Sequence, residues 1–489
     1  MQAHLALPLI HGEDVVGGLT FDFAAPVEVR GTNELFVGLL AQATADALVR
    51  ARRFDEEREA LVLLKLRGQI RYAWERSPFY REKWTAAGVS PDDLRTVADL
   101  SHFPVVQKHE LRAEQTAHPP YGRYLCIEPH EVARIHGTSG TTGRPTVFGI
   151  GRDDWARIGE AHARILWGAG VRPSDIVLIA SFFSLYMGSW GALAGIERLG
   201  ATAFPFGAGV QGQTLMAVRW AQQMRPTAFY GTPSYALHLA ETARKEGIDP
   251  KTLGFRVLFF SGEPGAGIPA TKKLIEETFG GACIDTGSTG EMTPWMTNGE
   301  CSARKGMHLW QDIVYTELCD PETFKPVPYG EEGTPVYTHL ERTSAPMIRF
   351  VAGDLGRWTD APCPCGRTYP RLPEGLYGRI DDMFIVRGEN IYPSAIEDVL
   401  RATEGFGGEF RIVISRTQAM DDLLVRVEVA KDHEPRRAQI EREMAQRLQA
   451  RVGVRPRLEL VSEGTLPRTE FKAKRVIDDR DLYRKGTST

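Results

Sequence analysis

Between residues 150 and 290, short apolar runs alternate with segments whose apolar side chains recur at helical spacing. The runs predict strands at Ile176–Ala180, Ala201–Pro205, Thr227–Tyr230, Arg256–Phe260 and Ala282–Asp285. The segments between them predict helices at Gly191–Leu199, Thr214–Met224, Ser234–Lys245 and Ile268–Phe279. This alternation is typical of a parallel sheet with helices on its faces. Ligands of such sheets bind at the carboxyl ends of the strands.

Two further patterns complete the predicted α/β architecture. Asp153 is expected to cap a helix, because apolar side chains follow it on one helical face, at Trp155, Ile158, Ile165 and Leu166. After residue 378 the pattern becomes α+β, with a helix at Tyr392–Arg401, strands at Glu409–Ser415 and Leu424–Val429, and a helix face at Ile440, Met444, Leu448 and Val452. We therefore expect a large domain with parallel sheets and flanking helices over residues 59–378, and a small C-terminal α+β domain over residues 379–489.

Residues 1–58 have a different pattern. Two strand-like runs, Leu5–Ile10 and Val15–Phe23, flank a turn, and a helical pattern begins at Asn33 and continues with mixed charges to Leu66. The segment resembles the C-terminal half of a GAF domain, a small ligand-sensing module. Half a sheet leaves unpaired edges, so the segment should pair with a second chain, dock on the main body or be partly disordered. A vestigial or dimerising appendage is favoured over a working sensor.

Composition excludes several functions. The chain has 489 residues, enough for two to four domains, and a net charge of -4, which does not suggest a nucleic-acid footprint. No run of 18 apolar residues suggests a membrane span. The first residues lack the basic-then-apolar pattern of a secretory signal, and six cysteines do not form a disulfide framework. A cytoplasmic enzyme is expected.

The sequence GTSGTTGRP at Gly137–Pro145 is the first candidate site. Glycines and hydroxyl side chains can present donors to a polyphosphate. The loop lacks the Gly-Lys-Ser/Thr ending of a P-loop, and it lies between strand-like runs at Val132–Ile135 and Val147–Ile150. It therefore predicts the tip of a hairpin. Composition alone leaves a flexible Ser/Thr/Gly turn equally open.

The segment Thr138–Thr146 resembles the phosphate-binding loop of the adenylate-forming enzymes, and SPFY at 77–80 with the segment from Leu100 to Lys108 resembles their phenylacetate-CoA ligase subgroup. The likeness covers roughly residues 66–480. It implies ATP, Mg²⁺ and coenzyme A as ligands. The ATP- or AMP-binding residues that it implies are Thr138, Ser139, Gly140, Thr141, Thr142, Gly143, Ser261, Gly262, Glu263, Pro264, Asp285, Thr286, Gly287, Ser288, Thr289, Asp354 and Arg379.

Specific roles follow from the resemblance. The segment at 261–264 would line the adenine pocket, Asp354 would accept the ribose hydroxyls, and Glu291 would help to hold Mg²⁺. The stretch before Glu291 departs from the family pattern, because the usual aromatic residue is missing, with Thr286 near its place, and Gly290 is additional.

The C-terminal motifs imply a moving small domain. Asp381 corresponds to the hinge, and Arg387, Gly388 and Asn390 would line the pantetheine tunnel for coenzyme A. Lys472 would be the catalytic lysine that reaches the acyl carboxylate and the α-phosphate, where a flexible cation offsets charge. Phe471 stands where glycine is usual, and Lys474 lies nearby.

The acyl pocket is expected to draw on Phe182, Tyr186, Trp190, Tyr230, Gly231, Thr232, Pro233 and Gly287. Bulky residues in the first of these loops favour a compact acid, either a small aromatic one or a short, branched or hydroxylated aliphatic one. The expected activity is an ATP-dependent, AMP-forming acid–CoA ligase. Two alternatives stay open: transfer of the acyl group to a carrier protein or an amine, and a degenerate ligase that acts as a ligand sensor. A homodimer is expected.

Four residues suggest a metal site away from the ATP motifs. Three cysteines and one histidine match a closed structural zinc site, namely Cys301, His308, Cys363 and Cys365. Some relatives in the subgroup carry such a zinc. The alternative is that these are unlinked buried residues, since free thiols behave as small hydrophobes.

Overall fold

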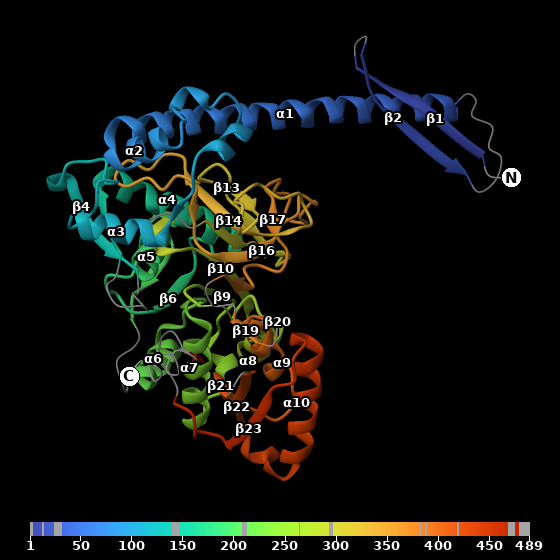
Figure 1. Cartoon of the computed structure of the whole chain (residues 1–489). Coiled ribbons are helices and arrows are strands. Elements are labelled where there is room, and N and C mark those ends of the chain that lie inside the picture. Colours follow the sequence, from blue (N-terminus) through green and yellow to red (C-terminus); the bar gives the residue numbers. More distant parts are fainter. Residues whose placement is uncertain are drawn as a thin grey trace.

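The structure is a computed structural model of the whole chain. It describes residues 3–11, 14–23, 32–138, 146–207, 213–263, 265–292, 297–380, 384–386, 389–417, 420–467 and 475–478. Figure 1 shows an N-terminal arm, a large domain beneath the C-terminal half of helix α1, and a small domain at the opposite end.

The N-terminal arm is a hairpin carried by a long helix. Strands β1 (Ala3–His11) and β2 (Asp14–Phe23) pair antiparallel, and α1 (Thr32–Arg76) contains 45 residues. At 1.5 Å per residue, α1 is about 68 Å long, and its first half projects away from the large domain with the hairpin packed on it (Figure 1). The predicted strands and the long connecting helix are confirmed. The resemblance to a GAF domain stays a prediction, and α1 runs without a break through the expected boundary at residue 58.

The large domain is built on a sheet with the strand order β17-β12-β11-β10-β9-β8-β6-β7. Its parallel strands are β6 (Ile176–Ala180), β7 (Thr202–Phe204), β8 (Ala228–Gly231), β9 (Val257–Phe260) and β10 (Ala282–Gly287). The strands β11 (Asn298–Glu300), β12 (Met307–Leu309) and β17 (Arg371–Leu372) extend it in antiparallel fashion. The flanking helices are α4 (Arg152–Ala169), α5 (Gly188–Leu199), α6 (Gln213–Met224), α7 (Pro233–Lys245) and α8 (Pro269–Phe279). The predicted parallel sheet is confirmed.

A second sheet joins segments that are distant in sequence. Its strands are β18 (Gly378–Arg379), β16 (Asp354–Arg357), β14 (Glu332–His339), β15 (Phe350–Val351) and β3 (Val106–Gln107), and β13 (Val314–Cys319) pairs with β14. The predicted hairpin around the glycine-rich loop is present as β4 (Val132–Gly137) and β5 (Val147–Gly151). Short helices accompany these strands: α2 (Pro78–Ala86), α3 (Lys108–Ala117), and 3₁₀ turns at Pro91–Asp93, Val97–His102, Pro129–Glu131, Pro250–Leu253 and Gly290–Met292.

One local prediction about helix α4 is wrong. Asp153 was expected to be the N-cap, but the cap is Gly151, and Asp153 lies within the first turn. The neighbouring Asp154 is fully buried and accepts hydrogen bonds from the backbone N–H groups of Thr343 and Ser344, at 2.9 and 2.7 Å. A tertiary contact to a remote loop therefore fixes this helix start in place of a local side-chain cap.

The small domain has the predicted α+β fold. A sheet with the order β23-β22-β21-β24 carries helices α9 (Pro393–Arg401) and α10 (Arg437–Val452). Its strands are β21 (Phe406–Thr417), β22 (Met420–Val429), β23 (Arg457–Ser462) and β24 (Val476–Asp478), with a separate hairpin of β19 (Phe384–Val386) and β20 (Glu389–Ile391) and a 3₁₀ turn at Lys431–Arg436. The predicted helix face of Ile440, Met444, Leu448 and Val452 is buried in the core of this domain.

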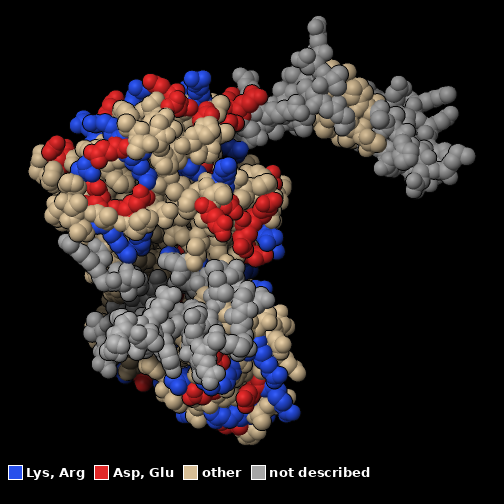
Figure 2. Space-filling model, in the orientation of Figure 1, with Lys and Arg blue, Asp and Glu red and all other residues tan. Residues whose placement is uncertain are grey.

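The surface agrees with the composition. On the face in Figure 2, acidic and basic side chains of the described residues are interspersed over both domains. Within the described ranges, every helix is too short or too polar to cross a lipid bilayer.

Candidate active site

The carboxyl ends of the parallel strands β8, β9 and β10 bring the sequence motifs together. Ser261, directly after β9, donates its backbone N–H to the Gly231 carbonyl at the end of β8, over 3.2 Å. Neighbouring parallel strands end at the same sheet edge, so Tyr230, Ser261 and Thr286 lie along one border of the sheet. This is the edge at which α/β sheets bind ligands.

Three hydroxyl side chains gather at this edge. The hydroxyl oxygens of Tyr230 and Ser261 are 2.7 Å apart, and both residues are buried. Gly262 has a φ of +94°, and a Cβ there would lie 3.2 Å from the Tyr186 hydroxyl. Burial raises the pKa of Tyr186 and of Tyr230, and a hydrogen bond with Ser261 opposes the rise in each case. At neutral pH the three groups are therefore uncharged hydrogen-bond donors and acceptors.

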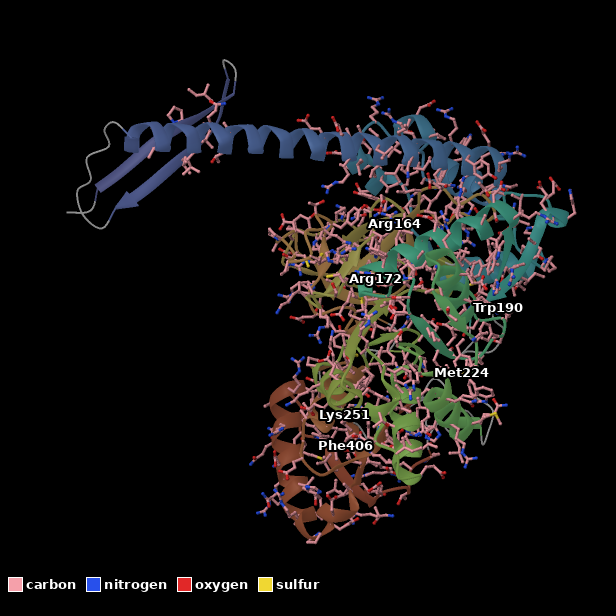
Figure 3. The ribbon with its side chains drawn as sticks, turned by 180° about the vertical axis from the view of Figure 1, so that it is seen from behind. Arg164, Arg172, Trp190, Met224, Lys251 and Phe406 are labelled. Atoms are coloured by element: carbon pink, nitrogen blue, oxygen red, sulfur yellow. The ribbon has the colours of Figure 1, made fainter. Side chains whose placement is uncertain are left out.

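The other predicted aromatic residues of the acyl pocket, Phe182 and Trp190, have different packing partners. Phe182 packs obliquely on Tyr186, with ring centroids 6.5 Å apart. The indole of Trp190 instead packs against Phe183 at 5.0 Å and donates to the Ser184 carbonyl, toward the edge of the domain (Figure 3).

Thr232 and Pro233 form the start of α7. The Thr232 hydroxyl accepts the Tyr235 N–H over 3.2 Å, and Pro233 occupies the first turn. A Cβ at Gly231 would come within 2.9 Å of the Ala180 carbonyl. These residues hold the main chain of this loop in place beside Tyr230.

Glu291 lies in a buried, cation-rich setting. Its side chain is 1% exposed and forms an ion pair with the Lys108 ammonium over 2.7 Å. The Thr289 hydroxyl donates to its other oxygen, and the buried Arg342 guanidinium donates to the Glu291 backbone carbonyl over 3.0 Å. The carboxylate is thereby fixed in one orientation, as a metal ligand requires.

The start of the glycine-rich loop meets Gly290, the residue before Glu291. A Cβ at Gly290 would lie 2.9 Å from the Thr138 methyl group, so this glycine permits the close approach of the two loops. The Thr138 N–H donates to the Thr146 carbonyl over 3.0 Å, which closes the base of the loop. The predicted residues Ser139, Gly140, Thr141, Thr142 and Gly143 lie outside the described residues.

Asp354 and Arg379 lie side by side on neighbouring strands. Their carboxylate and guanidinium are 3.2 Å apart, because β16 and β18 pair antiparallel with these residues in register. Arg379 also donates to the Ala352 carbonyl over 3.3 Å. A partly exposed carboxylate with an arginine beside it is suited to a polyhydroxylated, phosphorylated ligand.

The end of β10 is crowded and carries a buried acid. Burial and the nearby Glu300 raise the pKa of Asp285 to about 8, against the opposing effect of Lys272. The Thr286 hydroxyl donates to the Phe260 carbonyl over 2.6 Å. A Cβ at Gly287 would overlap the Asn298 side chain at 2.1 Å. Glycine at this position therefore leaves room for the neighbouring strand.

The four predicted metal ligands come together. The donor atoms of Cys301, His308, Cys363 and Cys365 all lie within 4.8 Å of one another. The Sγ atoms of Cys301 and Cys363 are 3.8 Å apart, and the Cys365 Sγ is 3.4 Å from His308 Nε2. Two thiolates bound tetrahedrally at about 2.3 Å from zinc would be separated by about 3.8 Å, so the spacing fits this metal.

Several predicted residues fall outside the described ranges, namely Pro264, Asp381, Arg387, Gly388 and Lys472. Asn390 lies in strand β20, opposite Ile385. Glu263 accepts the backbone N–H of Ser234 over 2.7 Å and so caps α7 from the adjacent strand end.

Two contacts of the site were not expected from the sequence. Lys108 was noted only as part of the family likeness, and its ion pair with Glu291 requires two segments far apart in the chain to meet. No motif marks Arg342. It follows the buried strand β14, but a single arginine there does not reveal its partner.

A sheet edge with a glycine-rich loop, a carboxylate–arginine pair, a fixed buried glutamate and a small C-terminal domain defines an adenylate-forming enzyme. A family model described as "AMP-binding enzyme" matches residues 25–337, and one described as "AMP-binding enzyme C-terminal domain" matches residues 388–480. The chain belongs to the AMP-binding enzyme family.

Curated relatives define the subgroup. Phenylacetate-coenzyme A ligase of Thermus thermophilus is 34% identical over 445 residues, which are 87% of this chain and 97% of the relative. Phenylacetate-coenzyme A ligase of Escherichia coli is 34% identical over 437 residues, covering 87% and 96%. The predicted resemblance to this subgroup is confirmed, and the chain is an AMP-forming acid–CoA ligase.

Solved structures agree and add information about the domain arrangement. A 2-hydroxyisobutyryl-CoA ligase in the postadenylation state, in complex with 2-HIB-AMP, has 54% sequence identity and a TM-score of 0.84, covering 88% of this chain and 91% of that one. The same relative with CoA in its thioesterification state gives a TM-score of 0.67 at the same coverage. The domain arrangement of the present structure is thus more similar to the postadenylation state of that enzyme.

Proposed function

We propose that this ligase activates a short, branched, hydroxylated aliphatic acid, of which 2-hydroxyisobutyrate is the model, and transfers it to coenzyme A. The observation that carries the proposal is the hydroxyl pair of Tyr230 and Ser261, 2.7 Å apart, with the Tyr186 hydroxyl beside Gly262. Buried hydroxyl groups favour a substrate that can hydrogen-bond to them, because an apolar acid would cover them without adding a hydrogen bond. The 2-hydroxyisobutyryl-CoA ligase at 54% identity supports this choice over a small aromatic acid.

In the proposed ATP site, residues 138–143 bind the phosphates. The segment 261–264 lines the adenine pocket, Thr289 contacts phosphate, and Asp354 accepts the ribose hydroxyls with Arg379 beside it. Glu291 would bind Mg²⁺, which supplies positive charge next to the phosphates. Its fixed, buried carboxylate fits that role, and the Lys108 ammonium pairs with one of its two oxygens.

The proposed reaction has two half-reactions. In the first, the substrate carboxylate attacks the α-phosphate of ATP, pyrophosphate leaves, and an acyl-adenylate forms, with the Lys472 ammonium offsetting charge on the carboxylate and phosphate. The small domain, from residue 379 onward, then turns about Asp381. This removes Lys472 and brings Arg387, Gly388 and Asn390 to the pantetheine path. In the second half-reaction the CoA thiol attacks the acyl carbon and AMP leaves.

The Cys/His cluster is proposed to hold one structural zinc ion. The sulfur–sulfur separation of 3.8 Å fits tetrahedral coordination, and four protein donors leave no open position for catalysis. The zinc would tie the loop at 363–365 to strand β12 and to the end of β11. Because the ligands are reduced thiols, we place the protein in the cytoplasm.

A homodimer through the N-terminal arm completes the proposal. Leu61 and Leu64 on α1 are 49% and 68% exposed, and both edges of the hairpin β1–β2 are unpaired among the described strands. Exposed leucines and free strand edges favour association with a second copy. Light scattering of the wild type and of Leu61→Lys/Leu64→Lys would test this, because only the wild type should have the mass of a dimer.

The deciding experiment is ATP–pyrophosphate exchange with a panel of acids, followed by product mass with and without coenzyme A. The panel contains 2-hydroxyisobutyrate, 3-hydroxybutyrate, isobutyrate, phenylacetate and a long-chain fatty acid. The proposal expects the highest kcat/KM for a hydroxylated short acid, with an acyl-CoA product. A higher value for phenylacetate would refute the substrate proposal, and exchange without a thioester product would move the acceptor to a carrier protein or an amine.

A further inference from the structure

A buried cluster of charged residues in the small domain surrounds Arg475. Its guanidinium donates to both oxygens of Glu397, at 3.1 and 3.3 Å, and to Glu409 at 3.0 Å. The Arg475 side chain is 12% exposed, and those of the two glutamates are 7% and 8% exposed. Charge-assisted hydrogen bonds in such a dry setting fix both position and orientation.

The cluster also binds the chain just before residues 468–474, at Leu466 and Pro467. Arg411 donates to the same Glu409 oxygen over 3.1 Å and to the Pro467 carbonyl over 2.5 Å. Glu428 accepts the Leu466 N–H over 2.8 Å. Just after residues 468–474, the Arg475 carbonyl accepts the Ile412 N–H over 2.7 Å, at the start of strand β24. Glu409 therefore links the two ends of the segment 468–474, directly to Arg475 and through Arg411 to Pro467.

This segment contains Lys472, which lies outside the described residues and has its catalytic role from the proposed function. A short chain segment with both ends fixed has fewer accessible conformations than one with a free end. Catalysis by a flexible lysine depends on such restriction, because a displacement of about 1 Å can lower a rate about 100-fold. The cluster is placed to supply this restriction.

The same cluster faces the large domain. Glu263, in the segment that follows β9, accepts the Ser234 N–H, and helices α8 and α9 pack together across this boundary (Figure 1). Burial raises the pKa of Glu263, while the Ser234 hydrogen bonds and the charge of Arg475 lower it.

We propose that Arg475 and Glu409 are positioning residues for adenylation: they clamp the two ends of the segment that carries Lys472. The inference rests on the proposed role of Lys472. It assigns the clamp to the first half-reaction, because that is the half-reaction in which Lys472 is proposed to act.

The test measures the two half-reactions separately in Glu409→Gln, Arg475→Lys and Arg475→Met. Adenylation is followed by pyrophosphate exchange, and thioester formation by reaction of a synthetic 2-hydroxyisobutyryl-adenylate with coenzyme A. We expect kcat for exchange to fall about 100-fold in Arg475→Met, with Arg475→Lys intermediate and the KM for ATP within about twofold of wild type. Thioester formation should stay within about twofold in all three. If Arg475→Met does not fold, Glu409→Gln and Arg475→Lys carry the test.

The matched control is Arg401→Met. Arg401 forms a buried ion pair with Glu397 at 2.8 Å, and its side chain is 6% exposed. Its guanidinium lies over the ring of Phe406, which is labelled in Figure 3. The described contacts of Arg401 do not reach the ends of the segment 468–474. It should lower thermal stability and leave the ratio of the two half-reactions unchanged. An equal fall of both half-reactions in the Arg475 variants, or a changed ratio in Arg401→Met, would overturn the proposal.

Lys472→Ala separates this inference from the proposed function. If Lys472→Ala leaves exchange intact, the catalytic role of Lys472 is wrong, and the clamp falls with it. If Lys472→Ala abolishes exchange while Glu409→Gln and Arg475→Met retain it, the proposed function stands and the clamp alone is refuted.

Discussion

Replacing Ser261 by alanine should change the relative kcat/KM values for different acids more than it changes the fold of the protein. The Ser261 side chain is 7% exposed, and its hydroxyl lies 2.7 Å from that of Tyr230. The substitution removes one oxygen atom and leaves the carbon framework of the pocket in place. A buried polar group that loses its hydrogen-bond partner costs about 1–3 kcal/mol, which is about 5- to 150-fold in kcat/KM.

This loss should apply only to substrates that carry a hydroxyl group. We expect kcat/KM for 2-hydroxyisobutyrate to fall by that factor in Ser261→Ala, whereas kcat/KM for isobutyrate should stay within about threefold or rise. Tyr186→Phe should act in the same direction. The assay is pyrophosphate exchange with both acids at saturating ATP, so that the ratio of the two kcat/KM values cancels any change in active-enzyme concentration.

A matched control is Ser77→Ala. Ser77 is also fully buried, but its hydroxyl caps helix α2 and donates to the Arg123 carbonyl at 2.9 Å, away from the sheet edge. It should cost about 1 kcal/mol of stability and leave the substrate ratio unchanged. A Ser261→Ala enzyme that loses activity equally toward both acids would refute the view that Ser261 recognises a substrate hydroxyl.

Three other outcomes follow from the buried charges and thiols. Cys365→Ser should lower the bound zinc, measured by mass spectrometry of the purified protein, and should reduce the melting temperature, whereas a zinc-free wild type would contradict the metal site. Arg349→Met should cost about 3–5 kcal/mol in urea unfolding, because it leaves the buried Glu317, 3.0 Å from the Arg349 guanidinium, without its partner. Since the pKa of Asp285 is about 8 in the fold, against about 3.9 when unfolded, the native state keeps a proton that the unfolded chain releases. Wild-type stability should therefore fall between about pH 4 and 8, by up to about 1.4 kcal/mol per unit. Asp285→Asn should lack this fall. If the free energy of unfolding in urea, measured at pH 5, 6.5 and 8, changed equally with pH in the two proteins, the prediction would be contradicted.

The sequence was most informative where strands are buried on both faces. The predicted Ile176–Ala180 is β6 itself, and the prediction of Arg256–Phe260 differs from β9 by one residue. Central parallel strands must be apolar throughout, so a short apolar run marks them even without a partner. The same reasoning found the helix face of α10, because its buried side chains recur every four residues.

Local signals failed where a remote segment decides the local structure. An aspartate ahead of an amphipathic helix predicts a cap, yet Asp153 lies in the first turn and its neighbour Asp154 binds the loop at Thr343 and Ser344. Lys108 is similar, because it is the first residue of α3, which packs against β3 of the second sheet, and it meets Glu291 only through the tertiary fold. Neither contact leaves a pattern in the surrounding residues.

The acyl pocket was predicted from the sequence only in part. The resemblance assigned Tyr230 to the acyl pocket and Ser261 to the adenine pocket, because each residue was placed by the motif that contains it. Strands β8 and β9 are neighbours and run parallel, with their last residues Gly231 and Phe260 paired about 4.8 Å apart, and Tyr230 and Ser261 each lie one residue from this pair. Side chains of adjacent strand ends then meet, as Tyr230 and Ser261 do at 2.7 Å. The order of the strands, and not further residues, was the missing information. Given that order, the same reasoning predicts that Ser261 lies beside Tyr230 and contributes to acyl recognition.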